Sequence, residues 1–329
     1  MNGTVKRNRR RKRKIQCIVR CSILVLILLA MIILIVFGVK SCTSKNSKKV
    51  NSSGELVDSS NKIEESTSGE QENKEKLPLM EYPAKSDNYV NIVNGEILSP
   101  DIAVIDVTDN KLVAGRNAET KIYPASMTKV MTLIVAVEHI DNLDEKFTMT
   151  SEIIDPLYRD SASRAGFEAG EEVTARDLMY GLILPSGADG AVGLAEMVSG
   201  SEEEFVKLMN EKCDELGLKN THFMNTSGLH NENHYTTPVE MGMILAYAME
   251  NKTCAEILST YQYTTEVNSY HPEGILLTST MFSRMYGDEV SGVKIVAGKT
   301  GYTQEAKQCL VSYAESAGKK YVVVTAGAD

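Results

Sequence analysis

The sequence contains no pair of cysteines in Cys-x-x-Cys spacing, although it has 6 cysteines in 329 residues. This absence excludes the common zinc-binding and redox motifs, and we expect neither a metal nor a cofactor. The cysteines are scattered along the chain, so we expect free thiols rather than disulfides at Cys42, Cys213, Cys254 and Cys309.

Acidic residues are absent from the first 50 residues, which contain 13 lysines and arginines. The remainder of the chain has 22 basic and 44 acidic residues, a charge of about −22. An acidic body gives no basis for nucleic acid binding, and a basic N-terminus indicates a tail that faces a membrane. We therefore expect no nucleic acid partner and an exported domain.

Charged residues are also absent from residues 22–39, an apolar run about as long as a bilayer core. Basic residues before the run predict that the N-terminus stays inside. We expect a cytoplasmic tail (1–16), a single-pass transmembrane signal anchor (17–39) in the cell membrane, and an extracellular body. A cleaved signal peptide is the alternative. A lipoprotein signal ending at Cys42 is disfavoured by Lys40.

Large apolar residues are scarce in residues 40–85, which are rich in Ser, Asn, Lys and Glu. Such a segment cannot bury a core, so we expect a disordered extracellular linker over 40–89. The remaining residues 90–329 are enough for one folded catalytic domain with a single core.

The pattern of residues 90–329 predicts strands at both ends of the domain and helices between them. Residues 102–106 and 112–115 flank a turn and predict a hairpin, and strands return at 293–299, 309–314 and 321–326. Between them lie helices predicted from Ser126 to about 140, after a cap at Thr174, over 189–198, from Ser201 to Gly217, and after Thr237. This order predicts an α+β fold with an antiparallel sheet completed by both ends of the domain.

Ser126 and Lys129 are three residues apart at the start of a predicted helix, so they share one face. An amine near a hydroxyl can accept its proton, provided that burial and a second cation, Lys299, lower the lysine's pKa. The helix N-terminus also favours developing negative charge. An N-cap serine with a surface lysine is the alternative, because Ser-x-x-Lys is common.

Two other segments extend this chemistry. Ser186 follows an apolar stretch between two helices and can pass a proton to a leaving amine, although a simple turn is the alternative. Residues 299–303 end a predicted edge strand: Lys299 offers charge, Thr300 and Thr303 offer hydroxyls to a carboxylate, and Gly301 admits a substrate backbone. Together the segments indicate acyl transfer by an activated serine.

In order, residues 123–129, 184–189 and 298–303 resemble the three motifs of the serine-type D-alanyl-D-alanine carboxypeptidases, the low-molecular-mass penicillin-binding proteins. Residues 216–221 and 225–230 resemble further segments of that family. The resemblance covers about 98–328. It implies a penicillin-recognising, β-lactamase-like serine transferase fold, with an antiparallel sheet flanked by helices and a helical subdomain.

The resemblance also implies roles for single residues. Ser126 would attack peptidoglycan stem peptides that end in D-Ala-D-Ala, Lys129 would take its proton, and Ser186 would help protonate the leaving D-alanine. The residues implied in substrate binding, including the Tyr302 N–H for the oxyanion and a weakly matched arginine, are Lys299, Thr300, Gly301, Tyr302, Thr303 and Arg284. β-Lactams would be covalent inhibitors.

The sequence departs from the family pattern in three places. Ala188 stands where the second motif usually has asparagine, which removes an amide that contacts the lysine and the substrate. The sequence stops directly after the last predicted strand, where the family continues with a closing helix; either the sequence is a fragment, or one face of the sheet lacks that helix. The expected anchor is N-terminal, whereas many members use a C-terminal amphipathic helix.

Three alternatives remain. A catalytically impaired domain that binds penicillin or muropeptides is consistent with Ala188. A class A β-lactamase would need a water-activating glutamate; the nearest match, Glu215, is followed by Lys219 where that family has asparagine. A zinc peptidase built on His230 and His234 lacks a glutamate next to the first histidine. Whether cross-links are cut in addition to terminal D-alanine is open.

Overall fold

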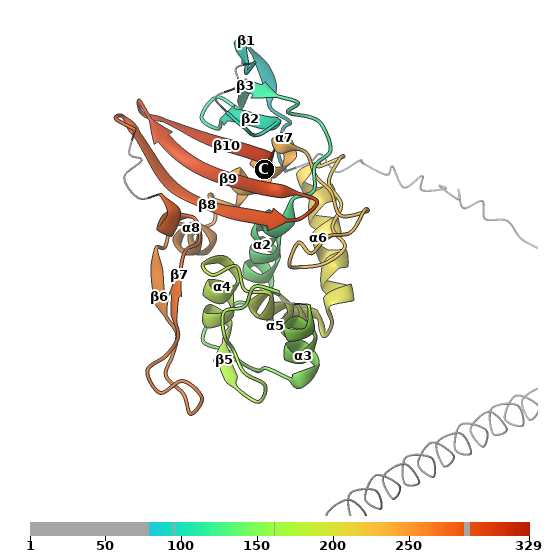
Figure 1. Ribbon diagram of the computed structural model, residues 1–329, viewed down its shortest axis with the longest axis vertical. Coiled ribbons are helices and arrows are strands. Elements are labelled where there is room, and N and C mark those ends of the chain that lie inside the picture. The colour runs from blue at the N-terminus through green and yellow to red at the C-terminus, as the bar shows by residue number, and fades with distance from the viewer. Residues whose placement is uncertain (1–78, 94, 96, 161, 286–289) are drawn as a thin grey trace, which may run out of the picture. The chain divides into compact units, whose positions relative to one another are not determined.

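The computed structural model describes residues 79–329 except 94, 96, 161 and 286–289 (Figure 1). The expected tail (1–16), the expected anchor (17–39) and most of the expected linker lie outside the described residues. Within the part of the chain that is described, no helix has both the length and the apolar character needed to cross a membrane.

The main sheet has six strands in the order β1-β3-β2-β10-β9-β8. Its strands are β1 (Ala84–Asn91), β2 (Asp101–Asp106), β3 (Lys111–Arg116), β8 (Val293–Thr303), β9 (Lys307–Ser316) and β10 (Lys319–Ala328). All neighbours pair antiparallel except β1 and β3, which are parallel. The last strand pairs with the first hairpin, with Val323 opposite Val104. The α+β prediction is therefore confirmed.

The start of the sheet corrects one expectation. The linker was expected to reach residue 89, but residues 84–91 form β1. Most side chains of β1 are exposed, so the strand is held by backbone hydrogen bonds to β3 rather than by burial. Composition carries no signal for a strand of this kind.

The helices of the middle region are α2 (Lys129–His139), α3 (Ser151–Arg159), α4 (Ala175–Ile183), α5 (Ala188–Ser199), α6 (Glu202–Leu216), α7 (Pro238–Ala248) and α8 (Lys252–Leu258). Three of them, α4, α6 and α7, begin at the predicted caps, whereas α3 and α8 were not predicted. The hydroxyls of Thr174, Ser201 and Thr237 each accept an N–H from three residues further on. Gly217 ends α6 with a φ of 76°. These predictions are confirmed.

The core lies where α7 packs on the sheet and where α2 meets the other helices. Gly242 of α7 faces side chains of Ile105, Val322 and Val324, which point from β2 and β10 to the same side. α2 contacts α4, α5, α6, α7 and α8, and it lies between the sheet and the lower helices (Figure 1). Because α2 is central, its first residues are held from several sides.

Two small hairpins were not predicted. β4 (Lys146–Thr148) pairs with β5 (Glu172–Thr174), and β6 (Gln262–Thr264) pairs with β7 (Leu276–Thr278). Each strand has three residues, too few for an alternating pattern to stand out. The β6–β7 hairpin extends below the edge strand β8 toward the helices (Figure 1).

Candidate active site

Ser126 lies in a short 3-10 turn, η1 (Ala125–Thr128), which leads directly into α2. The expected helix therefore begins with a tighter turn. Two glycines allow other segments to pack against this turn. A Cβ at Gly228, whose φ is 85°, would lie 1.9 Å from the Ala125 carbonyl oxygen, and one at Gly301 would lie 3.1 Å from the Ser126 nitrogen. The protein's own packing is thus tight around Gly301, in addition to the expected approach of a substrate.

Lys129 is buried beside Ser126, with 2% of its surface exposed. Its Nζ lies 3.2 Å from Ser126 Oγ and donates to the Ser227 carbonyl oxygen at 2.6 Å. Burial lowers the pKa of Lys129 to about 7, and the negative charges of Asp189 and Glu202 act in the opposite direction. An amine with this pKa is partly neutral at physiological pH and can accept a proton.

Lys299 joins the sheet to the second motif. Its Nζ donates to Ser186 Oγ and to the Thr300 carbonyl oxygen, both at 2.9 Å. Burial lowers the pKa of Lys299 well below its ordinary value, and the positive charges of Lys129 and Arg284 lower it further. For Lys129, burial is the cause that lowers the pKa, so the expected contribution of Lys299 to that lowering is not borne out.

Ser186 adopts a left-handed conformation, with φ at 66°, which is uncommon for a residue with a side chain. The turn lies between α4 and α5, and it holds the hydroxyl within hydrogen-bonding distance of Lys299. Strained backbone of this kind persists where the surroundings fix it, and it is frequent at active sites. The structure therefore forms two hydrogen-bonded pairs, Ser126 with Lys129 and Ser186 with Lys299.

Ala188 begins α5, and its N–H donates to the Ser163 carbonyl oxygen at 2.7 Å. The next residue, Asp189, does not stand in for the missing amide. Its carboxylate accepts the N–H groups of residues 165, 166 and 167 at 2.8, 3.0 and 3.3 Å. It is fully buried, and burial raises its pKa. Asp189 thus fixes the loop between α3 and β5.

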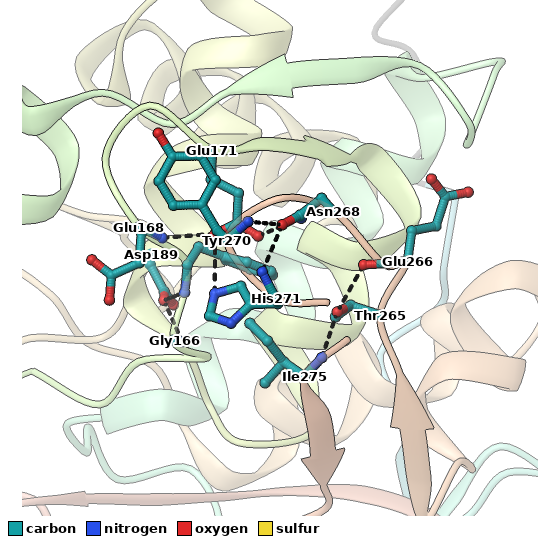
Figure 2. Close-up of polar contacts among 11 residues, drawn as sticks. Gly166, Glu168, Glu171, Asp189, Thr265, Glu266, Asn268, Tyr270, His271 and Ile275 are labelled. Atoms are coloured by element: carbon teal, nitrogen blue, oxygen red, sulfur yellow. Dashed lines mark hydrogen bonds and ion pairs between the residues drawn. The ribbon is translucent and has the colours of Figure 1, made fainter. Parts of the chain in front are cut away.

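The β6–β7 loop holds the same region from outside (Figure 2). The buried carboxylate of Glu171 accepts the Asn268 side-chain amide at 2.7 Å and the Glu168 N–H at 2.8 Å. His271 Nε2 lies 3.4 Å from the same carboxylate, and the Gly166 N–H donates to the carboxylate of Asp189 at 3.0 Å (Figure 2). The wall next to Ser186 is therefore braced by two buried acids, neither of which was predicted.

The residues expected to hold a carboxylate lie along β8 or near it. The strand continues to Thr303, so the third motif lies inside an edge strand and not at its end. Thr300 Oγ1 is 2.8 Å from Thr280 Oγ1, and Thr303 Oγ1 accepts the Ala306 N–H at 3.0 Å. The side chain of Tyr302 points outward, with 59% of the residue exposed. Arg284 is exposed on η2 (Phe282–Arg284), near enough to influence Lys299.

His234 also lies near Ser126, the predicted nucleophile. Its Nε2 is 2.7 Å from Thr128 Oγ1, and its Nδ1 accepts the Met224 N–H at 3.2 Å. Burial lowers its pKa to about 3, so the imidazole is neutral. Because both ring nitrogens contact protein groups, His234 is a structural hydrogen-bonding residue, and the proposed pairing with His230 around zinc has no support from this geometry.

The model of the peptidase S11 family, described as D-alanyl-D-alanine carboxypeptidase, matches residues 88–329. The chain belongs to this family. It is 34% identical over 226 residues to D-alanyl-D-alanine carboxypeptidase DacF of Bacillus subtilis (strain 168), covering 69% of this chain and 56% of that protein. It is 35% identical over 212 residues to D-alanyl-D-alanine carboxypeptidase of Streptomyces sp. (strain K15), covering 62% of this chain and 72% of that protein.

Solved structures of S11-type proteins have the same fold. The Streptomyces K15 DD-transpeptidase aligns with a TM-score of 0.66 at 31% identity, over 72% of this chain and 92% of that one. D-alanyl-D-alanine carboxypeptidase of Mycobacterium tuberculosis H37Rv aligns with a TM-score of 0.65 at 26% identity, over 75% of this chain and 88% of that one. The penicillin-recognising fold implied by the motifs is thus confirmed. The chain spans just over half of the Bacillus protein, 56% of its length.

Several residues of the site were missed by sequence reasoning. The Ser227 carbonyl is a backbone group, which gives no residue-type signal. Glu202 lies in the first turn of α6 and was not singled out, yet its carboxylate accepts the N–H and the hydroxyl of Thr226 at 2.9 and 2.6 Å. Thr280 lies in a segment without a recognisable motif. The resemblance of residues 225–230 to a family segment was the one available clue.

Proposed function

We propose that the chain is a serine peptidase that removes the terminal D-alanine from peptidoglycan stem peptides through an acyl-enzyme on Ser126. The observation that supports this most is the buried Lys129 amine, 3.2 Å from Ser126 Oγ and with a pKa lowered to about 7. A buried lysine that is partly neutral has no structural advantage, because burial penalises its charge. Its use is to accept the serine's proton.

The proposed reaction has two steps. Ser126 Oγ forms a bond to the carbonyl carbon of the penultimate D-alanine while its proton passes to Lys129. The main-chain N–H groups of Ser126 and Tyr302 stabilise the oxyanion. The C–N bond then breaks, and the leaving amine receives a proton through Ser186. Water attacks the ester, and its proton returns through Lys129, which restores the free serine.

The terminal carboxylate of the substrate would lie against the third motif. Lys299 and Thr300 are the main groups, with Gly301 lining the site and Thr303 and Arg284 near it. A carboxylate favours the charged form of Lys299, whose pKa burial has lowered. Lys299 also donates to Ser186 Oγ, so carboxylate binding and proton delivery to the leaving group are connected through one amine. β-Lactams, which carry an equivalent carboxylate, would acylate Ser126 and inhibit the enzyme.

A domain that binds muropeptides or penicillin without turnover is the second candidate, because Ala188 removes an amide. The assembled pairs Ser126–Lys129 and Ser186–Lys299 favour turnover over binding alone. A class A β-lactamase is disfavoured further, because the carboxylate of Glu215 forms an ion pair with Lys212 on α6 at 2.5 Å. We retain the carboxypeptidase.

The decisive experiment is mass spectrometry of the purified full-length chain with two ligands. Incubation with a D-alanyl-D-alanine peptide should release D-alanine, and incubation with a penicillin should add its mass at Ser126. Ser126→Ala should abolish both. An adduct without D-alanine release would favour the binding domain, and labelling that persists in Ser126→Ala would overturn the assignment of the nucleophile.

We further propose the membrane arrangement that the sequence predicts, with a tail over 1–16, an uncleaved anchor over 17–39 and a linker that places the catalytic domain outside the cell membrane. The charge-free run 22–39 after a basic segment supports this. Protease treatment of intact cells should remove the domain and leave a short membrane-bound stub. A mature protein that begins near residue 40 would instead establish a cleaved signal.

A further inference from the structure

Thr280 lies between β7 and η2 and contacts both walls of the site. Its N–H donates to the Leu184 carbonyl oxygen at 2.9 Å, two residues before Ser186. Its Oγ1 lies 2.8 Å from Oγ1 of Thr300 on β8. One residue therefore connects the segment that holds the proposed proton relay to the hydroxyl that is proposed to hold the carboxylate.

The bound substrate determines which of the two threonine hydroxyls donates the hydrogen bond between them. Each threonine hydroxyl has one proton to donate, and the hydroxyl of Thr300 cannot donate it both to Thr280 and to a ligand. A carboxylate only accepts, so Thr300 must turn its proton toward the ligand. The short contact then requires that Thr280 is the donor to Thr300 Oγ1. A donor in this position also fixes the rotamer of Thr300 and strengthens its hydrogen bond to an anion.

We propose that Thr280 is a positioning residue for recognition of the substrate's terminal carboxylate, acting through Thr300. This proposal rests on the proposed function. It has a specific consequence, because Thr280 matters only for ligands that carry the carboxylate. Loss of its hydroxyl should weaken acylation by such ligands and leave acylation by ligands without a carboxylate unchanged. A merely structural role would affect both.

The test compares two activated substrates that differ in one group. The first is an N-acyl-D-alanyl thioester whose leaving group carries a free carboxylate, and the second is its methyl ester. Thioesters are reactive enough to acylate the serine without help from the third motif. In the full-length chain, Thr280→Val should lower kcat/KM for the free acid about fivefold, the factor expected from one neutral hydrogen bond. It should leave kcat/KM for the methyl ester unchanged.

Two further variants distinguish positioning from folding. Thr280→Ser keeps the hydroxyl and should restore kcat/KM for the free acid. Thr278→Val is a matched control, because the Thr278 hydroxyl accepts a hydrogen bond from Gln262 on the neighbouring strand. It should leave both substrates unaffected.

A double-mutant cycle tests whether Thr280 acts through Thr300. The double variant Thr280→Val/Thr300→Val should be no slower with the free acid than Thr300→Val alone, because the acceptor is already lost. Equal losses on both substrates, multiplicative losses in the double variant, or an unaffected Thr280→Val enzyme would each overturn the proposal. A wild-type chain that processes neither thioester would instead contradict the proposed function.

Discussion

The amine of Lys129 is held 2.6 Å from the carbonyl oxygen of Ser227, a residue 98 positions further along the chain. A carbonyl oxygen only accepts hydrogen bonds, so Lys129 always directs one N–H toward it. In the neutral amine this leaves the lone pair free for the hydroxyl of Ser126. The loop of Ser227 is held in turn by Thr226, which bonds to Glu202 and to Thr132.

The first prediction concerns the pH dependence of acylation. Lys129 must be neutral to act as a base, and its pKa is lowered to about 7. The kcat/KM for penicillin acylation should therefore rise with pH through about 7 and level off above it. Lys129→Arg should be almost inactive, because a guanidinium does not deprotonate. An arginine variant with wild-type acylation would refute the role of Lys129 as base.

The second prediction concerns Glu202. In Glu202→Gln the side-chain oxygen can still accept from Thr226, but the negative charge that raises the pKa of Lys129 is removed. The acid limb of the pH profile should move to lower pH. The other charges near Lys129, Asp189 and Lys299, are unchanged, and His234 stays neutral. The exposed neighbour provides a control, since Glu203→Gln should not move the limb. A shift to higher pH would contradict the prediction.

The third prediction concerns the stability cost of the buried base. Because its pKa falls from 10.5 to about 7 on folding, the unfolded chain binds more protons between these values, and stability rises with pH there. Lys129→Met removes this effect. The free energy of unfolding of Lys129→Met should exceed that of the wild type most below pH 7. This difference should shrink by at most about 5 kcal/mol between pH 7 and pH 10.5, at roughly 1.4 kcal/mol per pH unit. Denaturant unfolding at several pH values measures this, and a constant difference would contradict it.

The fourth prediction concerns Gly228. A methyl group there would collide with the Ala125 carbonyl, so Gly228→Ala must displace either its own loop or the turn of Ser126. We expect a loss of at least about 3 kcal/mol in stability and more than tenfold in acylation rate. Gly200→Ala is the matched control, with a φ of 75° but nothing within 4 Å of the added carbon. It should cost only about 1–2 kcal/mol and leave acylation unchanged. Equal effects at both positions would refute the steric explanation.

The fifth prediction concerns Ala188. If the remaining residues are sufficient for catalysis, the natural chain should release D-alanine, and Ala188→Asn should change the rate by less than about tenfold. Release of D-alanine from a peptide substrate measures this. A natural chain that is inactive until asparagine is introduced would show instead that the site is an impaired binder.

Several parts of the fold follow from local sequence. The caps at Thr174, Ser201 and Thr237 each use a side chain and an N–H three residues apart, so the pattern that predicts them also contains both partners. Ser126 and Lys129 are also three apart, and any helical turn places them on one face. The three family motifs could also be recognised from the sequence, because each is a short continuous segment.

Other parts depend on contacts that no local pattern contains. β1 was missed because its partner strand, and not its own composition, holds it. Asp189 is next to a motif residue, but only the folded loop shows that its carboxylate turns to the N–H groups of residues 165–167. The β6–β7 hairpin and its bonds to Glu171 span 97 residues of sequence.

The sequence by itself determined the class of fold and the family, and it pointed to the proposed nucleophile, the proposed base and the third motif, because these are encoded in residue types at fixed short spacing. Only the tertiary structure decided which groups surround the Lys129 amine and which hydroxyl contacts Thr300. The pKa of Lys129 is set by burial, and burial is a property of the packed helices around α2. Lys299 and Ser186 are 113 residues apart in the sequence, and only the fold brings their side chains into hydrogen-bonding contact.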